Sequence, residues 1–96
     1  MSKSKLGRHQ THDRVLERAI KKIVKIQTIE KVLVGRTVPA KHRYPQGAVR
    51  LVAKTDAGLK LRAYGPSLVV EIFVTVAPEK IPLTLAALWL AWPQFF

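Results

Sequence analysis

The chain has 96 residues, the length of one domain with a single modest core. Seventeen lysines and arginines stand against six acids, which gives a net charge of +11. Self-repulsion of that size opposes a compact state, so we expect a polyanionic partner, with nucleic acid first and an anionic membrane surface second. The absence of cysteine excludes disulfides, thiolate zinc sites and cysteine nucleophiles, and is typical of a reducing, cytoplasmic setting.

Residues 1–12 form a basic segment without a single acid. Its only large aliphatic side chains are Met1 and Leu6, so it cannot build a core. We therefore predict a basic N-terminal tail over residues 1–12 and one folded domain over residues 13–96. The tail residues that we expect to contact RNA are Lys3, Lys5, Arg8, His9 and His12.

From Arg14 onward, apolar residues recur three and four positions apart, which predicts an amphipathic helix. The predicted apolar stripe consists of Val15, Leu16, Ala19, Ile20, Ile23 and Val24. The opposite side carries five cations against one acid, Glu17, whereas an ordinary solvated face mixes the two signs. We therefore expect this side to face phosphates through Arg14, Arg18, Lys21, Lys22 and Lys25.

A strand rich in β-branched residues is predicted at 29–38, and a loop at 39–47 brings Lys41, Arg43 and Tyr44. Three strands with a period of two follow at 49–54, 59–64 and 68–76, separated by tight turns. Strict alternation puts one set of side chains on an exposed sheet face: Arg50, Lys54, Lys60, Arg62, Tyr64, Glu71 and Phe73. There Lys60 or Arg62 can pair with Glu71.

Residues 81–92 are apolar all round and predict a helix that ends before Pro93. The run is only about a dozen residues, and a membrane span needs about 20. It has almost no polar face, so we expect no membrane partner. Such a helix is either buried on both sides within the chain or covered by a neighbouring protein.

The predicted order is α-β-β-β-β-α. This indicates a single small α+β domain, an antiparallel sheet with both helices packed on one face.

Several short motifs are shared with a known group of proteins. They are Gly7-Arg8-His9, Thr11-His12, Lys31-Val32, Gly35-Arg36, Gly58-Leu59-Lys60-Leu61-Arg62 and Glu71-Ile72-Phe73-Val74. Residues 7–77 resemble an uncharacterised prokaryotic family of small domains, common in archaea, labelled predicted metal-binding proteins. The resemblance implies histidine ligands near the N-terminus. Only His9 and His12 match, and Gln10 and Thr11 separate them, so a pattern of adjacent histidines is not met.

Metal binding and catalysis both lack a convincing set of residues. His9 and His12 are weak candidates for a zinc site, with Asp13 and His42 as further ligands, but surrounding cations disfavour a dication. The six acids are scattered and no nucleophile stands with a base, so we expect no enzyme and no cofactor.

The distribution of cations and aromatic residues favours RNA. Cations occur in the tail, the first helix, the loop (Lys41, Arg43) and the sheet (Arg50, Lys60, Arg62), interleaved with tyrosines on which bases can stack. We expect a small ribosomal or ribosome-associated protein that contacts rRNA phosphates, as part of a ribonucleoprotein in which the apolar C-terminus docks on a neighbouring protein. The alternatives are a DNA-binding subunit of a replication or chromatin assembly and a metal-binding regulatory domain.

Overall fold

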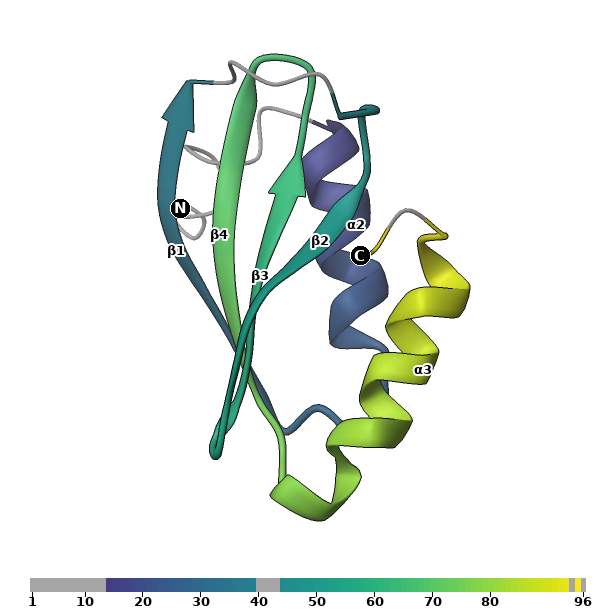
Figure 1. Ribbon diagram of the computed structural model, residues 1–96. Coiled ribbons are helices and arrows are strands. Elements are labelled where there is room, and N and C mark those ends of the chain that lie inside the picture. Colours follow the sequence, from purple (N-terminus) through teal and green to yellow (C-terminus); the bar gives the residue numbers. More distant parts are fainter. Residues whose placement is uncertain (1–13, 40–43, 94, 96) are drawn as a thin grey trace, which may run out of the picture.

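The computed structural model describes residues 14–39, 44–93 and 95 of the chain. Its elements, in chain order, are α2 (Arg14–Val24), β1 (Lys31–Pro39), β2 (Val49–Thr55), β3 (Gly58–Tyr64), β4 (Leu68–Thr75), the 3₁₀ turn η1 (Pro78–Lys80) and α3 (Ile81–Ala91). Among the described residues, one antiparallel sheet has α2 and α3 on one side and no helix on the other (Figure 1). The predicted α+β fold, with both helices on one face, is confirmed.

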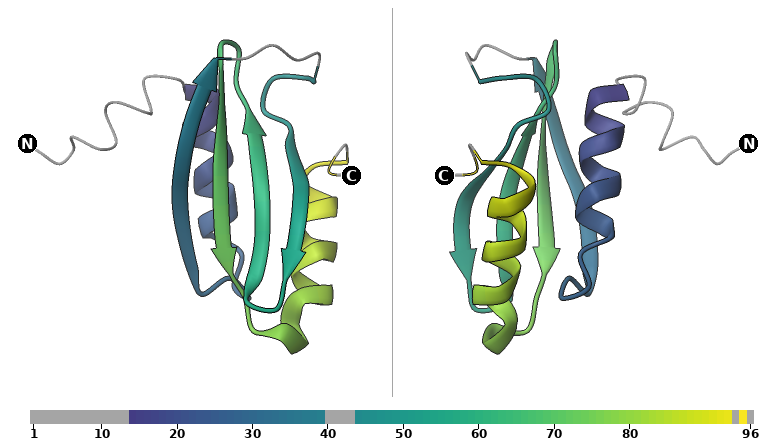
Figure 2. Two further views of the ribbon diagram at one scale, coloured as in Figure 1. Left: turned by 60° about the vertical axis from the view of Figure 1, so that its left-hand side comes forward. Right: turned by 90° about the vertical axis from the view of Figure 1, so that its right-hand side faces the viewer.

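The strands lie in the order β1-β4-β3-β2, and every neighbouring pair is antiparallel. Tight turns join β2, β3 and β4 into the predicted meander. In the first turn the Thr55 hydroxyl accepts hydrogen bonds from the amides of Ala57 and Gly58, both at 3.1 Å. Glycine is required at Gly58, because a Cβ there would overlap the carbonyl oxygen of Val74. β1 pairs with β4, so β1 and β2 are the two edges of the sheet (Figure 2).

The core lies between the sheet and the helices. Alternation along β3 and β4 turns their apolar residues toward this layer: Leu59, Leu61, Ala63, Val70, Ile72 and Val74. From α2, Leu16, Ala19 and Ile23 pack against them at helical spacing. Val24, predicted to belong to the same stripe, is the last residue of the helix and is 57% exposed, so the stripe ends at Ile23.

α3 follows η1 and lies on the same sheet face as α2 (Figure 2). The buried hydroxyl of Thr84 donates to the carbonyl of Lys80 at 2.9 Å and shares a 2.5 Å hydrogen bond with the hydroxyl of Thr28, so it has partners on two elements. Beyond the helix, Phe95 is fully buried and its carbonyl accepts a 3.1 Å bond from the amide of Leu51. The inner side of α3 therefore completes the chain's own core.

The outer side of α3 remains open. Leu83, Trp89 and Leu90 are 64%, 51% and 78% exposed, so the helix is buried on one side only. Within residues 14–39 and 44–93, none of the helices has the length and apolar character needed to cross a bilayer.

Both edge strands contain a β-bulge, and these bulges change which side chains share a face. In β2, Leu51 pairs with Leu61 and Ala53 with Lys60, so Val52 is an extra residue. The alternation reverses at that point: Ala53 turns to the open face and Lys54, opposite Leu59, turns to the helix side. The prediction that Lys54 lies on the exposed sheet face is therefore wrong.

Candidate nucleic-acid interface

The side chains on the open face of the sheet form three rows that cross the strands. The register places the members of each row next to one another. The arginine row contains Arg36, Glu71, Arg62 and Arg50. The tyrosine row contains Val38, Val69, Tyr64 and Tyr44. The phenylalanine row contains Leu33, Phe73, Lys60 and Ala53. Successive rows are about 6–7 Å apart, because side chains on one face repeat every two residues.

The arginine row combines three guanidinium groups with one carboxylate and so keeps a positive charge. Nη2 of Arg62 donates to Oε2 of Glu71 at 3.1 Å, which is one of the two pairings that the sequence left open. This hydrogen bond, with the charges of Lys60, Arg62 and Arg36, lowers the pKa of Glu71, so its carboxylate is ionised at neutral pH. Arg36 has no ion-pair partner within the described part of the chain, and its charge is available to a ligand.

Arg50 is held between two tyrosines. Its Nη1 donates to the hydroxyl of Tyr64 at 3.4 Å, and its Cζ lies 4.7 Å from the centroid of the Tyr44 ring. The hydrogen bond to Tyr64 raises the pKa of Arg50, which therefore stays charged. The two tyrosine rings are 4.7 Å apart between centroids and tilted by 38°. Tyr64 is buried and Tyr44 is 40% exposed, so Tyr44 presents aromatic surface that a ligand can reach.

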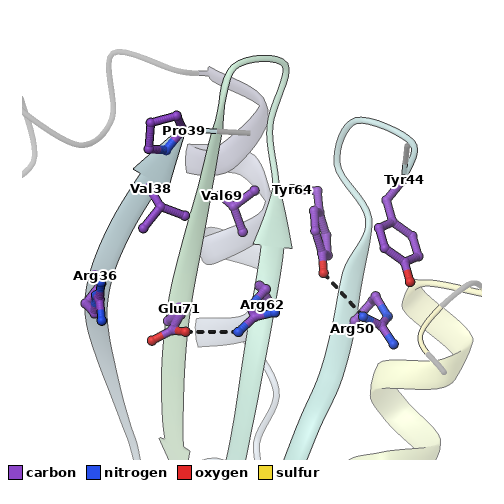
Figure 3. Close-up of a pocket in the computed structure, with 9 residues that line it drawn as sticks. All are labelled: Arg36, Val38, Pro39, Tyr44, Arg50, Arg62, Tyr64, Val69 and Glu71. Carbon is purple, nitrogen blue, oxygen red and sulfur yellow. Dashed lines mark hydrogen bonds and ion pairs between the residues drawn. The ribbon is translucent and has the colours of Figure 1, made fainter. Parts of the chain in front are cut away.

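A hollow of about 450 Å³ lies between the arginine and tyrosine rows (Figure 3). This volume is within the range of roughly 300–1,000 Å³ that small-ligand sites occupy. Its floor is apolar, from Val38 and Val69, and its charged rim is the arginine row. A second hollow of about 360 Å³ adjoins it on the phenylalanine row, beside Leu33, Lys60 and Phe73. Together they form a continuous surface that joins cations to exposed apolar and aromatic groups.

The cations of α2 lie on the opposite side of the molecule. All five predicted contact residues of this helix are exposed: Arg14, Arg18, Lys21, Lys22 and Lys25. Because α2 packs on the other face of the sheet, its outer side points away from the arginine row (Figure 1). The predicted contact residues therefore fall on two separate surfaces, with Arg50, Lys60 and Arg62 on one and the α2 cations on the other.

Seven predicted contact residues lie outside the described residues, and the structure does not place them: Lys3, Lys5, Arg8, His9, His12, Lys41 and Arg43. The weak metal candidates His9 and His12 are among them. Within the described residues, no three His, Cys, Asp or Glu side chains come together as metal ligands do.

Arg36 is the site residue that sequence reasoning missed. Strict alternation puts it on the same face as Val34, toward the helices. In the structure Val34 pairs with Ile72 and Thr37 with Val70, so Gly35 and Arg36 together oppose a single residue of β4. Because of this bulge, the side chain of Arg36 lies on the open face. The available signal was Gly35, because an isolated glycine in a strand often marks a bulge.

Comparison of the chain with models of known protein families, with curated proteins and with solved structures finds no match. The resemblance to the archaeal family therefore stays a prediction, and the site is interpreted from its own geometry.

Proposed function

We propose that this protein binds RNA through the open face of its sheet and that the RNA is single-stranded where it makes contact. The observation that carries the proposal is the arginine row lying directly beside the stacked tyrosines. Phosphates need cations, and unpaired bases need flat apolar or aromatic surface; the two rows supply both within about 7 Å.

The geometry of this face favours a single strand over a duplex. A duplex keeps its bases stacked inside and presents phosphates and groove edges, so its bases cannot stack on an exposed tyrosine. Tyr44 is positioned to stack on a splayed base, and Arg50 beside it can reach an adjacent phosphate. Arg36 lies at the other edge of the sheet and can reach a phosphate farther along the strand (Figure 3). The tyrosine contacts also hold Arg50 in place, which lowers the entropy lost on binding.

Fluorescence anisotropy of the full chain with a labelled oligouridine RNA tests this proposal. We expect tighter binding to the single strand than to duplex RNA or duplex DNA of equal length. Log affinity should fall linearly with log salt, and the slope should shrink by about 0.7 for each contact cation replaced by glutamine. Tighter binding to duplex DNA would favour the DNA-binding alternative, and no binding to any of the three would overturn the proposal.

We further propose that the RNA is ribosomal, because a small domain whose charge is dominated by cations is suited to fill space between rRNA phosphates. Gradient sedimentation of native lysate at low and high salt tests this. Comigration with a ribosomal subunit that survives high salt indicates an integral component, and release at high salt indicates a peripheral factor. Sedimentation at the top of both gradients would rule out the ribosome, and DNA and metal binding would be tested next.

A further inference from the structure

The outer side of the helical layer combines an apolar ridge with a cationic stripe. On α3, Leu83 and Leu90 project away from the sheet, and Trp89 lies on the flank of this ridge. On α2, the side opposite the buried stripe is cationic, with Lys21 in the last turn and Lys25 directly after the helix. Both helices lie on the same sheet face (Figure 2) and bury one side against it, so the ridge and the stripe both belong to the outer side of the helical layer.

The cationic stripe and the apolar ridge are connected where α2 approaches the end of α3. Nζ of Lys22 lies 4.8 Å from the centroid of the Trp92 ring, which bridges α2 to the end of α3. A hollow of about 260 Å³ lies beside this contact and is lined by residues of α2, by Gln46 and Gly47, and by Trp92. One face of the molecule is therefore apolar along one helix and positively charged along the next.

We infer that this face docks on an anionic lipid bilayer, with α3 at the level of the acyl chains and the α2 cations among the headgroups. An interfacial helix normally carries its apolar and cationic sides on one element. Here two helices share these roles, which is why α3 read alone shows no polar side and does not by itself predict a membrane partner. The helices lie on the surface, and neither crosses it.

The composition of the ridge favours a bilayer over an acidic protein. A protein interface makes about one hydrogen bond per 100–200 Å². The exposed ridge of α3 offers one side-chain donor, the indole of Trp89, because the hydroxyl of Thr84 is buried and bonded within the chain. Lipid tails require no hydrogen bonds, and tryptophan is the aromatic residue that the membrane interface prefers.

Flotation of the full chain with lipid vesicles tests the inference, using phosphatidylcholine alone and phosphatidylcholine with 30% phosphatidylglycerol, a composition of about one anionic lipid in three. We expect binding only to the anionic vesicles, together with a shift of tryptophan emission to shorter wavelength. Trp89→Phe should abolish most of that shift, because Trp92 is already buried in the free protein. Leu83→Ser with Leu90→Ser should weaken binding by about tenfold or more.

Matched charge variants show whether vesicles bind one face of the protein or are attracted by its net positive charge. Lys21→Gln with Lys25→Gln should weaken vesicle binding about 25-fold, at roughly fivefold per cation. Arg36→Gln with Lys60→Gln removes the same charge from the sheet and should change vesicle binding by less than about twofold. Equal losses from the two pairs, or no binding by the native chain, would overturn the inference.

The serine variants need their own control for folding. Both leucines are mostly exposed, so the thermal melting of the double variant should match the native protein; if it does not, Leu90→Ser alone replaces it. A folded serine variant that binds anionic vesicles as well as the native chain would show that no apolar group enters the bilayer. Self-association of the chain without vesicle binding would instead assign the ridge to a second copy.

Discussion

The open face of the sheet and the outer face of α2 are both cationic, but they hold their cations in different ways. On the sheet, Arg50 is fixed by Tyr64 and Tyr44, and Arg62 by Glu71. On α2, Lys21 and Lys25 have no side-chain partner within the described residues. Fixed guanidinium groups beside aromatic rings suit a ligand with a defined shape, whereas solvated ammonium groups suit a diffuse negative surface. Charge alone therefore does not identify the partner.

The sharpest test of this comparison reverses two positive charges on one face and, in a second variant, two on the other. Arg36→Glu with Arg50→Glu should weaken binding to single-stranded RNA about 100-fold, because each charge-assisted contact contributes about 1.5 kcal/mol. Lys21→Glu with Lys25→Glu lowers the net charge equally and should cost less than about fivefold. Anisotropy titrations at one salt concentration measure both. A larger loss from the α2 pair would move the RNA site to the helix.

Tyrosine stacking gives the next largest expected effect. Tyr44→Ala should weaken single-stranded RNA binding about tenfold, since stacking of one base on an aromatic ring contributes about 1–3 kcal/mol. Tyr44→Phe keeps the ring and should bind almost as the native protein does. Binding of duplex RNA should be unchanged by either substitution. If both RNAs lose affinity equally on Tyr44→Ala, the tyrosine supports Arg50 and does not stack on a base.

Removal of the single carboxylate in the arginine row should strengthen RNA binding. Glu71→Gln releases Arg62 from its ion pair and raises the charge of the row, so we expect about a threefold gain in affinity and a salt slope steeper by about 0.7. Glu79→Gln is the matched control, because it makes the same charge change in η1, away from the sheet. An equal gain from the control would mean that net charge is the cause.

The smallest expected effect is a pH dependence of that gain. The pKa of Glu71 is lowered, chiefly by its hydrogen bond from Arg62, so the carboxylate stays ionised to a lower pH than an ordinary glutamate does. Above that pH the ion pair with Arg62 is intact; as the pH falls through the lowered pKa, the pair is lost. The advantage of Glu71→Gln over the native chain on oligouridine should therefore shrink toward nothing at low pH. A constant advantage would contradict the role of the ion pair.

The sequence predicts those parts of the molecule in which local pattern and tertiary packing agree. The 3.6-residue stripe of α2 and the strict alternation of β3 and β4 lead directly to the buried residues and to the Arg62–Glu71 pair. Both errors on the sheet face occur in the edge strands, because strict alternation predicts Lys54 on this face and Arg36 on the other. A bulge depends on how a strand pairs with its neighbour, and alternation within one strand contains no information about that pairing.

The candidate site depends on two further features that pattern alone does not supply. Sequence spacing shows that α2 and the sheet are both cationic, but the separation of their charges onto opposite sides follows from which sheet face the helix covers. Tyr44 precedes β2 in the chain, and its contact with Tyr64 and Arg50 arises only when the segment before β2 folds over the end of β3. Both features are long-range, so no local pattern encodes them.

The bulge at Gly35 and Arg36 also changes the edge that β1 presents to other copies of the chain. A long flat edge strand with exposed Leu33, Val34 and Val38 would be a template for pairing with other copies of the chain. The extra residue interrupts the regular spacing of amides and carbonyls along β1 and places a charge at the interruption. Deleting Gly35 would leave Arg36 opposite Glu71 on the open face, because Val34 and Thr37 would keep their partners on β4. It would also restore a continuous edge on which aggregation can begin.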